Sequence, residues 1–197
     1  MGTRFAVRGG RAVAAALFLS LSLLAGCGDS KDTAAQPGPS PASIAPAPKA
    51  TPASVKIAKI GAESSLIKTA VKSDGSLDVP PVDKPMQASW YAFSAVPGQP
   101  GAAVLLGHVD GNSQPGIFFK LKELSVGDEV TVKMSDGTDL KFAVSKTQQV
   151  NKDELPKDAI FGKTDASELR LITCGGVFDK AAHSYKDNTV VYAKLKT

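Results

Sequence analysis

The sequence has few cysteines and histidines, and it has no recognisable cofactor motif. Two of its 197 residues are cysteine and two are histidine. It contains no glycine-rich phosphate loop, dinucleotide fingerprint, metal-ligand spacing or internal repeat, so we expect neither a metal nor any other cofactor. The folded part also lacks a basic stripe with interleaved aromatic side chains, which argues against nucleic-acid binding.

The net charge of +4 comes mostly from the N-terminus. Residues 1–26 contain three arginines and no acidic residue. The rest of the chain therefore has 20 basic against 19 acidic residues, a net charge of +1. The basic overall composition gives no reason to expect an acidic partner.

The first 26 residues are typical of an export signal. Three arginines precede an apolar run from Ala12 to Leu24, which is too short for a comfortable membrane span. The run ends in Leu24-Ala25-Gly26-Cys27, the lipobox pattern of bacterial lipoproteins. We expect cleavage before Cys27 and lipidation of its thiol. The alternative is an ordinary signal peptide with an incidental cysteine.

Residues 27–53 are rich in Ala, Pro, Ser and Gly and have almost no bulky apolar side chain. This composition predicts an extended, disordered linker. Together with lipid on Cys27, the linker would hold the remaining domain, residues 54–197, outside the cytoplasm at the cell membrane of a bacterium. That remainder has a suitable size for one domain.

Short strand signals dominate residues 54–197. Apolar runs bounded by Gly, Pro and Asp turns favour a β-barrel or a β-sandwich. The predicted strands are 55–60, 103–108, 128–133, 140–144, 168–174 and 189–193. Short helices are expected only within 114–124 and 152–161.

Cys174 is the best candidate for a nucleophile. If Cys27 carries lipid, Cys174 is the only thiol left in an exported protein, so it is either buried and inert or kept free for chemistry. Gly175 and Gly176 follow it directly. This pattern predicts a strand end with bare backbone beside the thiol, where a substrate carbonyl can approach.

His108 is the best candidate for the partner of Cys174. It follows an apolar run and Gly107, so we expect it where a strand gives way to a turn. An adjacent imidazole is a common way to populate the thiolate. A semi-buried structural histidine is the alternative. His183 lies in a polar stretch and is interpreted as a solvated loop residue.

Longer motifs surround both residues. They run Val104–Gly111 (VLLGHVDG), Leu169–Asp179 (LRLITCGGVFD) and Ser184–Ala193 (SYKDNTVVYA), with Leu77–Pro81 and Trp90-Tyr91 before them. In this order they resemble the sortase family, and in particular the class F sortases of actinobacteria. The resemblance extends from about Ile57 to the C-terminus and implies a mainly β fold, a closed or nearly closed sortase-type β-barrel.

The resemblance also implies a cysteine transpeptidase. Such an enzyme cleaves an LPxTG-like peptide sorting signal of exported proteins after Thr, holds the acyl group as a thioester on Cys174, and passes it to an amine acceptor such as a cell-wall precursor. His108 would protonate the departing amine, and a donor must stabilise the oxyanion. Two alternatives remain, namely a hydrolase that uses the same thioester and a catalytically silent binding module.

The third catalytic residue departs from the family pattern. Sortases supply part of the oxyanion donor with an arginine on the strand after the cysteine strand, but no arginine follows Cys174. The usual position holds Asn188, with Lys186 on the same strand face. The only arginine of residues 54–197 is Arg170, on the same side of its strand as the cysteine. Four strand residues span ~13 Å, so we expect Arg170 to contact substrate, with Asn188 and Lys186 as alternatives.

Three acidic residues lie near the predicted site, namely Asp110, Asp179 and Asp187. We interpret them as solvated turn residues. The alternatives are calcium binding or orientation of His108 by one of them.

Overall fold

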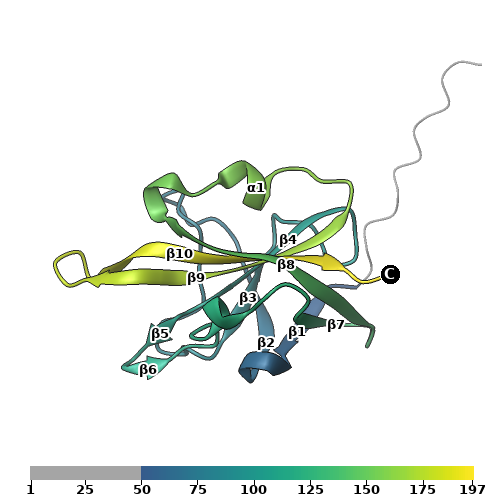
Figure 1. The fold of residues 1–197 in the computed structure, drawn as a ribbon, viewed down its shortest axis with the longest axis horizontal. Helices are drawn as coiled ribbons and strands as arrows, with labels where there is room; N and C mark the ends of the chain where they lie inside the picture. The colour runs from purple at the N-terminus through teal and green to yellow at the C-terminus, as the bar shows by residue number, and fades with distance from the viewer. Residues whose placement is uncertain (1–49) are drawn as a thin grey trace, which may run out of the picture. The chain divides into compact units, whose positions relative to one another are not determined.

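Residues 50–197 are described by the computed structural model, and they form an eight-stranded closed β-barrel (Figure 1). The strand order is β1-β2-β3-β4-β9-β10-β8-β7, and β7 pairs with β1 to close the barrel. The predicted mainly β fold with a closed barrel is confirmed. Cys27 and most of the predicted linker lie outside the described residues.

The barrel strands are β1 (Pro52–Ile57), β2 (Ala62–Thr69), β3 (Ala88–Tyr91), β4 (Gly101–Gly107), β7 (Glu129–Met134), β8 (Asp139–Asn151), β9 (Ser167–Asp179) and β10 (Ser184–Leu195). The short strands β5 (Asp110–Gly111) and β6 (Gln114–Pro115) form a separate hairpin after β4. The helices are η1 (Ala58–Ile60), η2 (Leu121–Glu123), η3 (Lys152–Glu154) and α1 (Lys157–Phe161). Between residues 50 and 197, no helix is long and apolar enough to cross a membrane.

All six strands predicted from the sequence are present, but β2 and β3 were not predicted. β2 has few buried side chains, and it is a strand because it pairs with β1 and β3 rather than because of its own apolar pattern. The strand predicted at 55–60 ends early. Its last three residues form η1, which Gly61 terminates in the left-handed conformation at φ +65°.

Two apolar clusters lie on opposite faces of the same strands. The inner face fills the barrel, and its large fully buried side chains include Phe118, Phe142, Leu105, Leu121, Leu169 and Leu171. The outer face of β4, β9 and β10 has its own cluster, Val104, Leu106, Ile160, Ile172, Val190 and Tyr192. Successive strand residues alternate between the two clusters, as a pleated strand requires. Ile160 comes from α1, which lies on this outer side (Figure 1).

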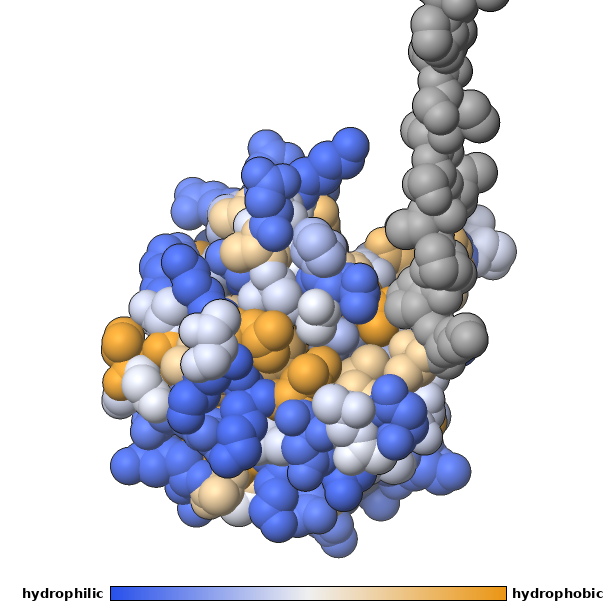
Figure 2. Space-filling model, turned by 90° about the vertical axis from the view of Figure 1, so that its right-hand side faces the viewer, coloured by the Kyte–Doolittle hydropathy of each residue, from blue (hydrophilic) through white to orange (hydrophobic). Residues whose placement is uncertain are grey.

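The β9–β10 hairpin and the β5–β6 hairpin project at the same end of the barrel, away from the C-terminus (Figure 1). The face near the C-terminus is mostly hydrophilic around a smaller apolar area (Figure 2). The predicted Cys174 and His108 belong to the end with the two hairpins.

Candidate active site

The parallel pairing of β4 with β9 places His108 and Cys174 at the same end of the barrel. Leu106 of β4 pairs with Ile172 of β9, and this is the last pair of the ladder. His108 and Cys174 each lie two residues beyond it. Because parallel strands run in the same direction, both residues reach the same end of the barrel.

The ring of His108 has one hydrogen-bond partner in the described part of the chain. Its Nε2 lies 2.6 Å from the carbonyl oxygen of Pro80, in the β2–β3 connection and within the motif at Leu77–Pro81. A carbonyl oxygen only accepts, so Nε2 holds the proton in this contact. In the neutral imidazole, Nδ1 is then the nitrogen free to accept a proton.

The backbone at His108 is tightly packed. The N–H of Phe118 donates to the carbonyl oxygen of His108 at 3.0 Å. A Cβ on Gly107 would lie 2.6 Å from side-chain carbons of Ile117 and Phe118, and a Cβ on Gly116 would overlap the His108 carbonyl. Glycine at both positions lets the 116–118 segment pack directly against the turn that presents His108.

Cys174 is half-buried and is a free thiol. The predicted strand end at Cys174 is wrong, because β9 continues to Asp179. The pairing of β9 with β10 instead shifts between Tyr185 and Asp187, and Gly176, at φ +75°, lies in this β-bulge. The bulge leaves bare backbone beside Cys174 without ending the strand.

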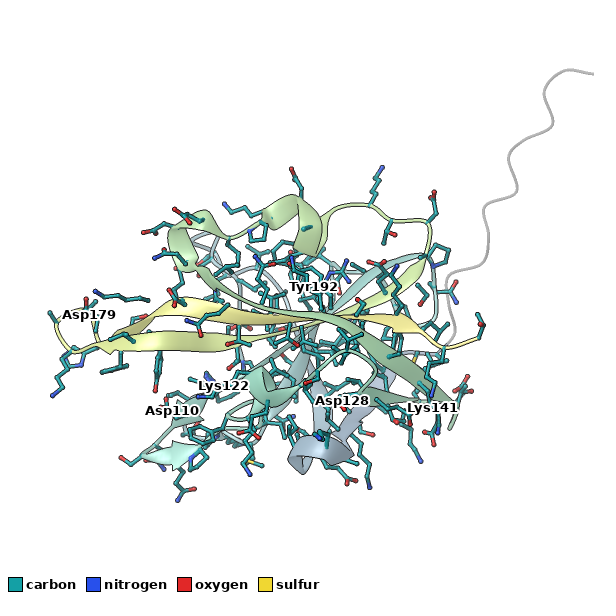
Figure 3. The ribbon with its side chains drawn as sticks, viewed as in Figure 1. Asp110, Lys122, Asp128, Lys141, Asp179 and Tyr192 are labelled. Atoms are coloured by element: carbon teal, nitrogen blue, oxygen red, sulfur yellow. The ribbon has the colours of Figure 1, made fainter. Side chains whose placement is uncertain are left out.

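A cavity of about 260 Å³ adjoins Cys174. Its walls come from β9, β10, β8, η2 and the connection after β4, and they include Val109, Phe118, Phe119, Lys122, Gln149, Thr173, Tyr185 and Thr189. In Figure 3, Asp110 and Lys122 lie on one side of the β9–β10 ribbon and Tyr192 lies on the α1 side. The lining of the cavity includes no residue of α1.

Thr173 contributes an unsatisfied hydroxyl next to Cys174. Its Oγ1 is the one buried side-chain polar atom without a hydrogen-bond partner among residues 50–197. Buried polar groups are nearly always paired, and exceptions concentrate at functional sites. Thr173 belongs to the motif at Leu169–Asp179, but nothing in that motif predicts that its hydroxyl is unpaired.

Asn188 is the direct neighbour of Cys174 on β10. The two residues are cross-strand partners in the antiparallel ladder, so their side chains lie on the same face. The other alternative, Lys186, lies farther along the hairpin, and its Nζ is 3.9 Å from a carboxylate oxygen of Asp179. Of the two, the pairing brings Asn188 to the thiol.

The guanidinium of Arg170 has no contact with Cys174 and binds other groups. Its guanidinium donates to the backbone carbonyls of Ala159 and Leu169, both at 3.1 Å, and to the carboxylate of Glu168. The guanidinium also stacks on Tyr192, 4.6 Å from the ring centroid. These contacts hold α1 against the outer face of β9, and the structure does not bring Arg170 to the thiol.

Tyr185 and Asp110 form a contact that the sequence did not predict. The hydroxyl of Tyr185 donates to a carboxylate oxygen of Asp110. This hydrogen bond, partial burial and the negative charges of Asp110 and ionised Cys174 raise the pKa of Tyr185 to about 12. The hydroxyl therefore keeps its proton at neutral pH. The interpretation of Asp110 as a solvated turn residue is wrong, because its carboxylate is paired and the residue is half-buried.

Among residues 50–197, no three His, Cys, Asp or Glu side chains are grouped to hold a metal ion. Asp179 accepts from the backbone N–H groups of Ala181 and Ala182, as a turn residue does. Asp187 accepts from Nε2 of Gln149 at 2.7 Å. His183 is exposed in the β9–β10 turn.

Three sortases of known structure are similar to the chain. A Clostridium perfringens sortase D5 transpeptidase has a TM-score of 0.55 at 19% identity, over 75% of this chain and 79% of that one. Sortase C-1 from Actinomyces oris has 0.58 at 20%, over 74% and 73%. Sortase A from Corynebacterium diphtheriae has 0.56 at 20%, over 75% and 61%. At these identities the likeness shows a shared fold.

No curated protein matches the chain in sequence. The sortase domain matches residues 55–196, which is the whole barrel apart from the first residues of β1. The chain therefore belongs to the sortase family, a family of cysteine transpeptidases that act on sorting signals.

Proposed function

We propose that Cys174 and His108 are the catalytic pair of an extracytoplasmic transpeptidase that cleaves an LPxTG-like sorting signal. The observation that supports this most is the register of β4 and β9, in which both residues lie two positions beyond the same strand pair. A cavity and bare glycine backbone adjoin the thiol, so a peptide carbonyl has a place to approach it.

The first half-reaction forms a thioester. His108 takes the thiol proton on Nδ1, because Nε2 donates to Pro80. The thiolate of Cys174 attacks the carbonyl carbon of the scissile peptide bond, and a tetrahedral oxyanion forms. When the oxyanion collapses, the C–N bond breaks and the imidazolium of His108 returns its proton to the departing glycine amine.

The second half-reaction transfers the acyl group. The acceptor amine attacks the thioester carbon, His108 removes a proton from the attacking nitrogen, and the C–S bond breaks to release the thiolate. The product is a new amide, and no oxidant or cofactor is needed. A hydrolase would follow the same steps with water in place of the amine.

We assign the side-chain oxyanion donor to Asn188. Its amide N–H₂ can donate to a carbonyl oxygen held above Cys174, because the two residues are cross-strand partners. Arg170 has a different role in this proposal. Its donors are occupied by Glu168 and two backbone carbonyls, so it anchors α1.

The class F assignment and the lipid anchor are also proposals. The class F assignment rests on the motifs around His108 and Cys174 together with the SYKDNTVVYA string. The anchor rests on the lipobox that ends at Cys27. Lipid at Cys27 would tether the barrel to the outer side of the cell membrane through the linker.

The first prediction concerns the thioester. The mature protein incubated with an LPxTG-type peptide gains the mass of the acyl fragment on Cys174, and an added amine converts this adduct to an amide product. Cys174→Ala abolishes the adduct, and His108→Ala slows its formation by about 10²–10⁴-fold, the usual contribution of a positioned acid–base group. Intact-protein and peptide mass spectrometry measure both.

His183→Ala is the matched histidine control and leaves the rate unchanged. Release of free acid at the same rate with and without the amine would instead identify a hydrolase. Binding of the peptide without any adduct on Cys174 would identify a binding module and overturn the proposal.

The second prediction concerns the oxyanion donor. Asn188→Ala lowers kcat for acylation by about 10²–10³-fold, because the developing charge loses a preorganised donor. The melting temperature changes little, since Asn188 is only partly buried. Steady-state kinetics with a quenched fluorescent peptide measure kcat, and Gln148→Ala on the neighbouring strand is the control. An unchanged kcat in Asn188→Ala would remove this residue from the mechanism.

The third prediction concerns Arg170. Arg170→Met leaves the largely buried carboxylate of Glu168 without its partner, so the free energy of unfolding falls, by up to about 3 kcal/mol. Adding Glu168→Gln to Arg170→Met restores a large part of this loss. Urea denaturation followed by circular dichroism measures the stabilities. A variant with wild-type stability and a large loss of kcat would return Arg170 to the catalytic site.

The fourth prediction concerns Cys27. Cys27→Ser loses metabolic palmitate labelling and releases the protein from the membrane fraction, because no thiol remains at the lipobox. Globomycin blocks processing of the wild-type chain only. Cys174→Ser serves as the control and keeps both the label and the membrane location. Palmitate labelling that survives in Cys27→Ser would exclude the lipobox.

A further inference from the structure

We propose that the hydrogen bond between Tyr185 and Asp110 is a positioning contact that holds His108 in working geometry with Cys174. The contact, named here the Tyr185–Asp110 clasp, joins the segment that carries the histidine to the hairpin that carries the cysteine. The inference rests on the proposed catalytic pair and adds two residues that act through it.

The clasp acts where backbone pairing stops. The regular ladder between β4 and β9 ends at Leu106 and Ile172, before either catalytic residue. Beyond that point β4 turns away into the β5–β6 hairpin while β9 continues with β10. The bond from Tyr185 to Asp110 spans the gap between these diverging segments.

The position of Asp110 in the chain lets it pass the restraint from Tyr185 to the backbone at His108. It is two residues after His108 and is the first residue of β5, paired with Pro115. The two-residue turn of the hairpin has Asn112 at φ +50° and Ser113 at φ +58°, as a type I′ turn requires. A hairpin this short has little freedom to absorb a shift, so fixing Asp110 fixes the chain at His108.

Tyr185 is itself held in place. It pairs with Phe178 across β9 and β10, and the two rings meet edge to face with centroids 5.1 Å apart. Tyr185 lines the cavity beside Cys174 and also a neighbouring cavity of about 570 Å³ formed by residues 110–115. The side chain therefore stands between the thiol and the β5–β6 hairpin.

The clasp complements the other contact that positions the histidine. The Pro80 carbonyl fixes the orientation of the His108 ring through Nε2. The clasp fixes the position of the backbone that carries the ring. Tyr185 does not compete for the role of oxyanion donor, because its proton is already donated to the Asp110 carboxylate.

The test uses the reactivity of Cys174 in the mature protein, which needs no peptide substrate. Alkylation by iodoacetamide at neutral pH follows the thiolate population, and peptide mapping by mass spectrometry assigns it to Cys174. We expect Tyr185→Phe and Asp110→Asn each to slow alkylation by about 10-fold and to lower kcat by about 10–100-fold. KM for an LPxTG-type peptide stays within about twofold of wild type, because the hydroxyl that Tyr185→Phe removes is bonded to Asp110 and not free for the peptide.

Two combinations of variants make the test specific. Tyr185→Phe combined with Asp110→Asn is no slower than either single variant, because both remove the same bond. In the His108→Ala background, Tyr185→Phe has no further effect on alkylation, because the clasp acts through the histidine. Tyr91→Phe is the matched control, since its hydroxyl forms no hydrogen bond within residues 50–197, and it leaves the rate unchanged.

The outcomes separate this inference from the proposed function. If His108→Ala slows alkylation but Tyr185→Phe and Asp110→Asn do not, the pair stands and the clasp is overturned. If Tyr185→Phe slows alkylation equally with and without His108, the tyrosine does not act through the histidine and the inference is wrong. If His108→Ala does not change the alkylation rate, His108 does not activate Cys174. Both the proposed catalytic pair and the role of the clasp are then overturned. Thermal melts exclude misfolding as the cause of a slow rate, and Asp110→Asn serves if Tyr185→Phe is unstable.

Discussion

The parallel pairing of β4 with β9 is the constraint on which the rest of the site depends. Most neighbouring strands of the barrel are antiparallel, and an antiparallel neighbour would send the residues after β4 to the opposite end from Cys174. Pairing Leu106 with Ile172 in the same direction places His108 and Cys174 at one end. The barrel interior keeps this register, since a slip by one residue would exchange its apolar side chains with those of the outer face.

The alternation of side chains along β9 separates the barrel interior from the α1 side. Leu171 and Leu169 face the barrel interior, whereas Ile172 and Arg170 face α1. A charged group on the α1 side is buried, so it needs partners there, and Glu168 and the Ala159 carbonyl supply them. Near Cys174 the bulge at Gly176 interrupts this pattern and opens the backbone to the cavity.

Local patterns in the sequence predicted the features that depend on local chemistry. The strands with strong apolar alternation, such as β1, β7 and β9, were predicted correctly. So was the position of His108 at the point where β4 gives way to a turn. β2 was missed because its pairing partners, and not its own side chains, make it a strand. The contacts of Arg170 with α1, the bond between Tyr185 and Asp110, and the bulge after Cys174 depend on segments far apart in sequence. The spacing of residues within one strand therefore cannot predict these contacts.

In the proposed mechanism Asn188 takes the place of an arginine, and this changes how the thiolate and the oxyanion are stabilised. An arginine beside the thiol would stabilise the oxyanion and would also lower the pKa of the thiol through its charge. A neutral amide can donate a hydrogen bond to the oxyanion but adds no positive charge beside Cys174. Formation of the thiolate then depends more heavily on the imidazole of His108, whose effect falls steeply with misplacement. In the proposed site the contacts that hold the histidine, at the Pro80 carbonyl and at the Tyr185–Asp110 clasp, would replace part of what a fixed cation would supply.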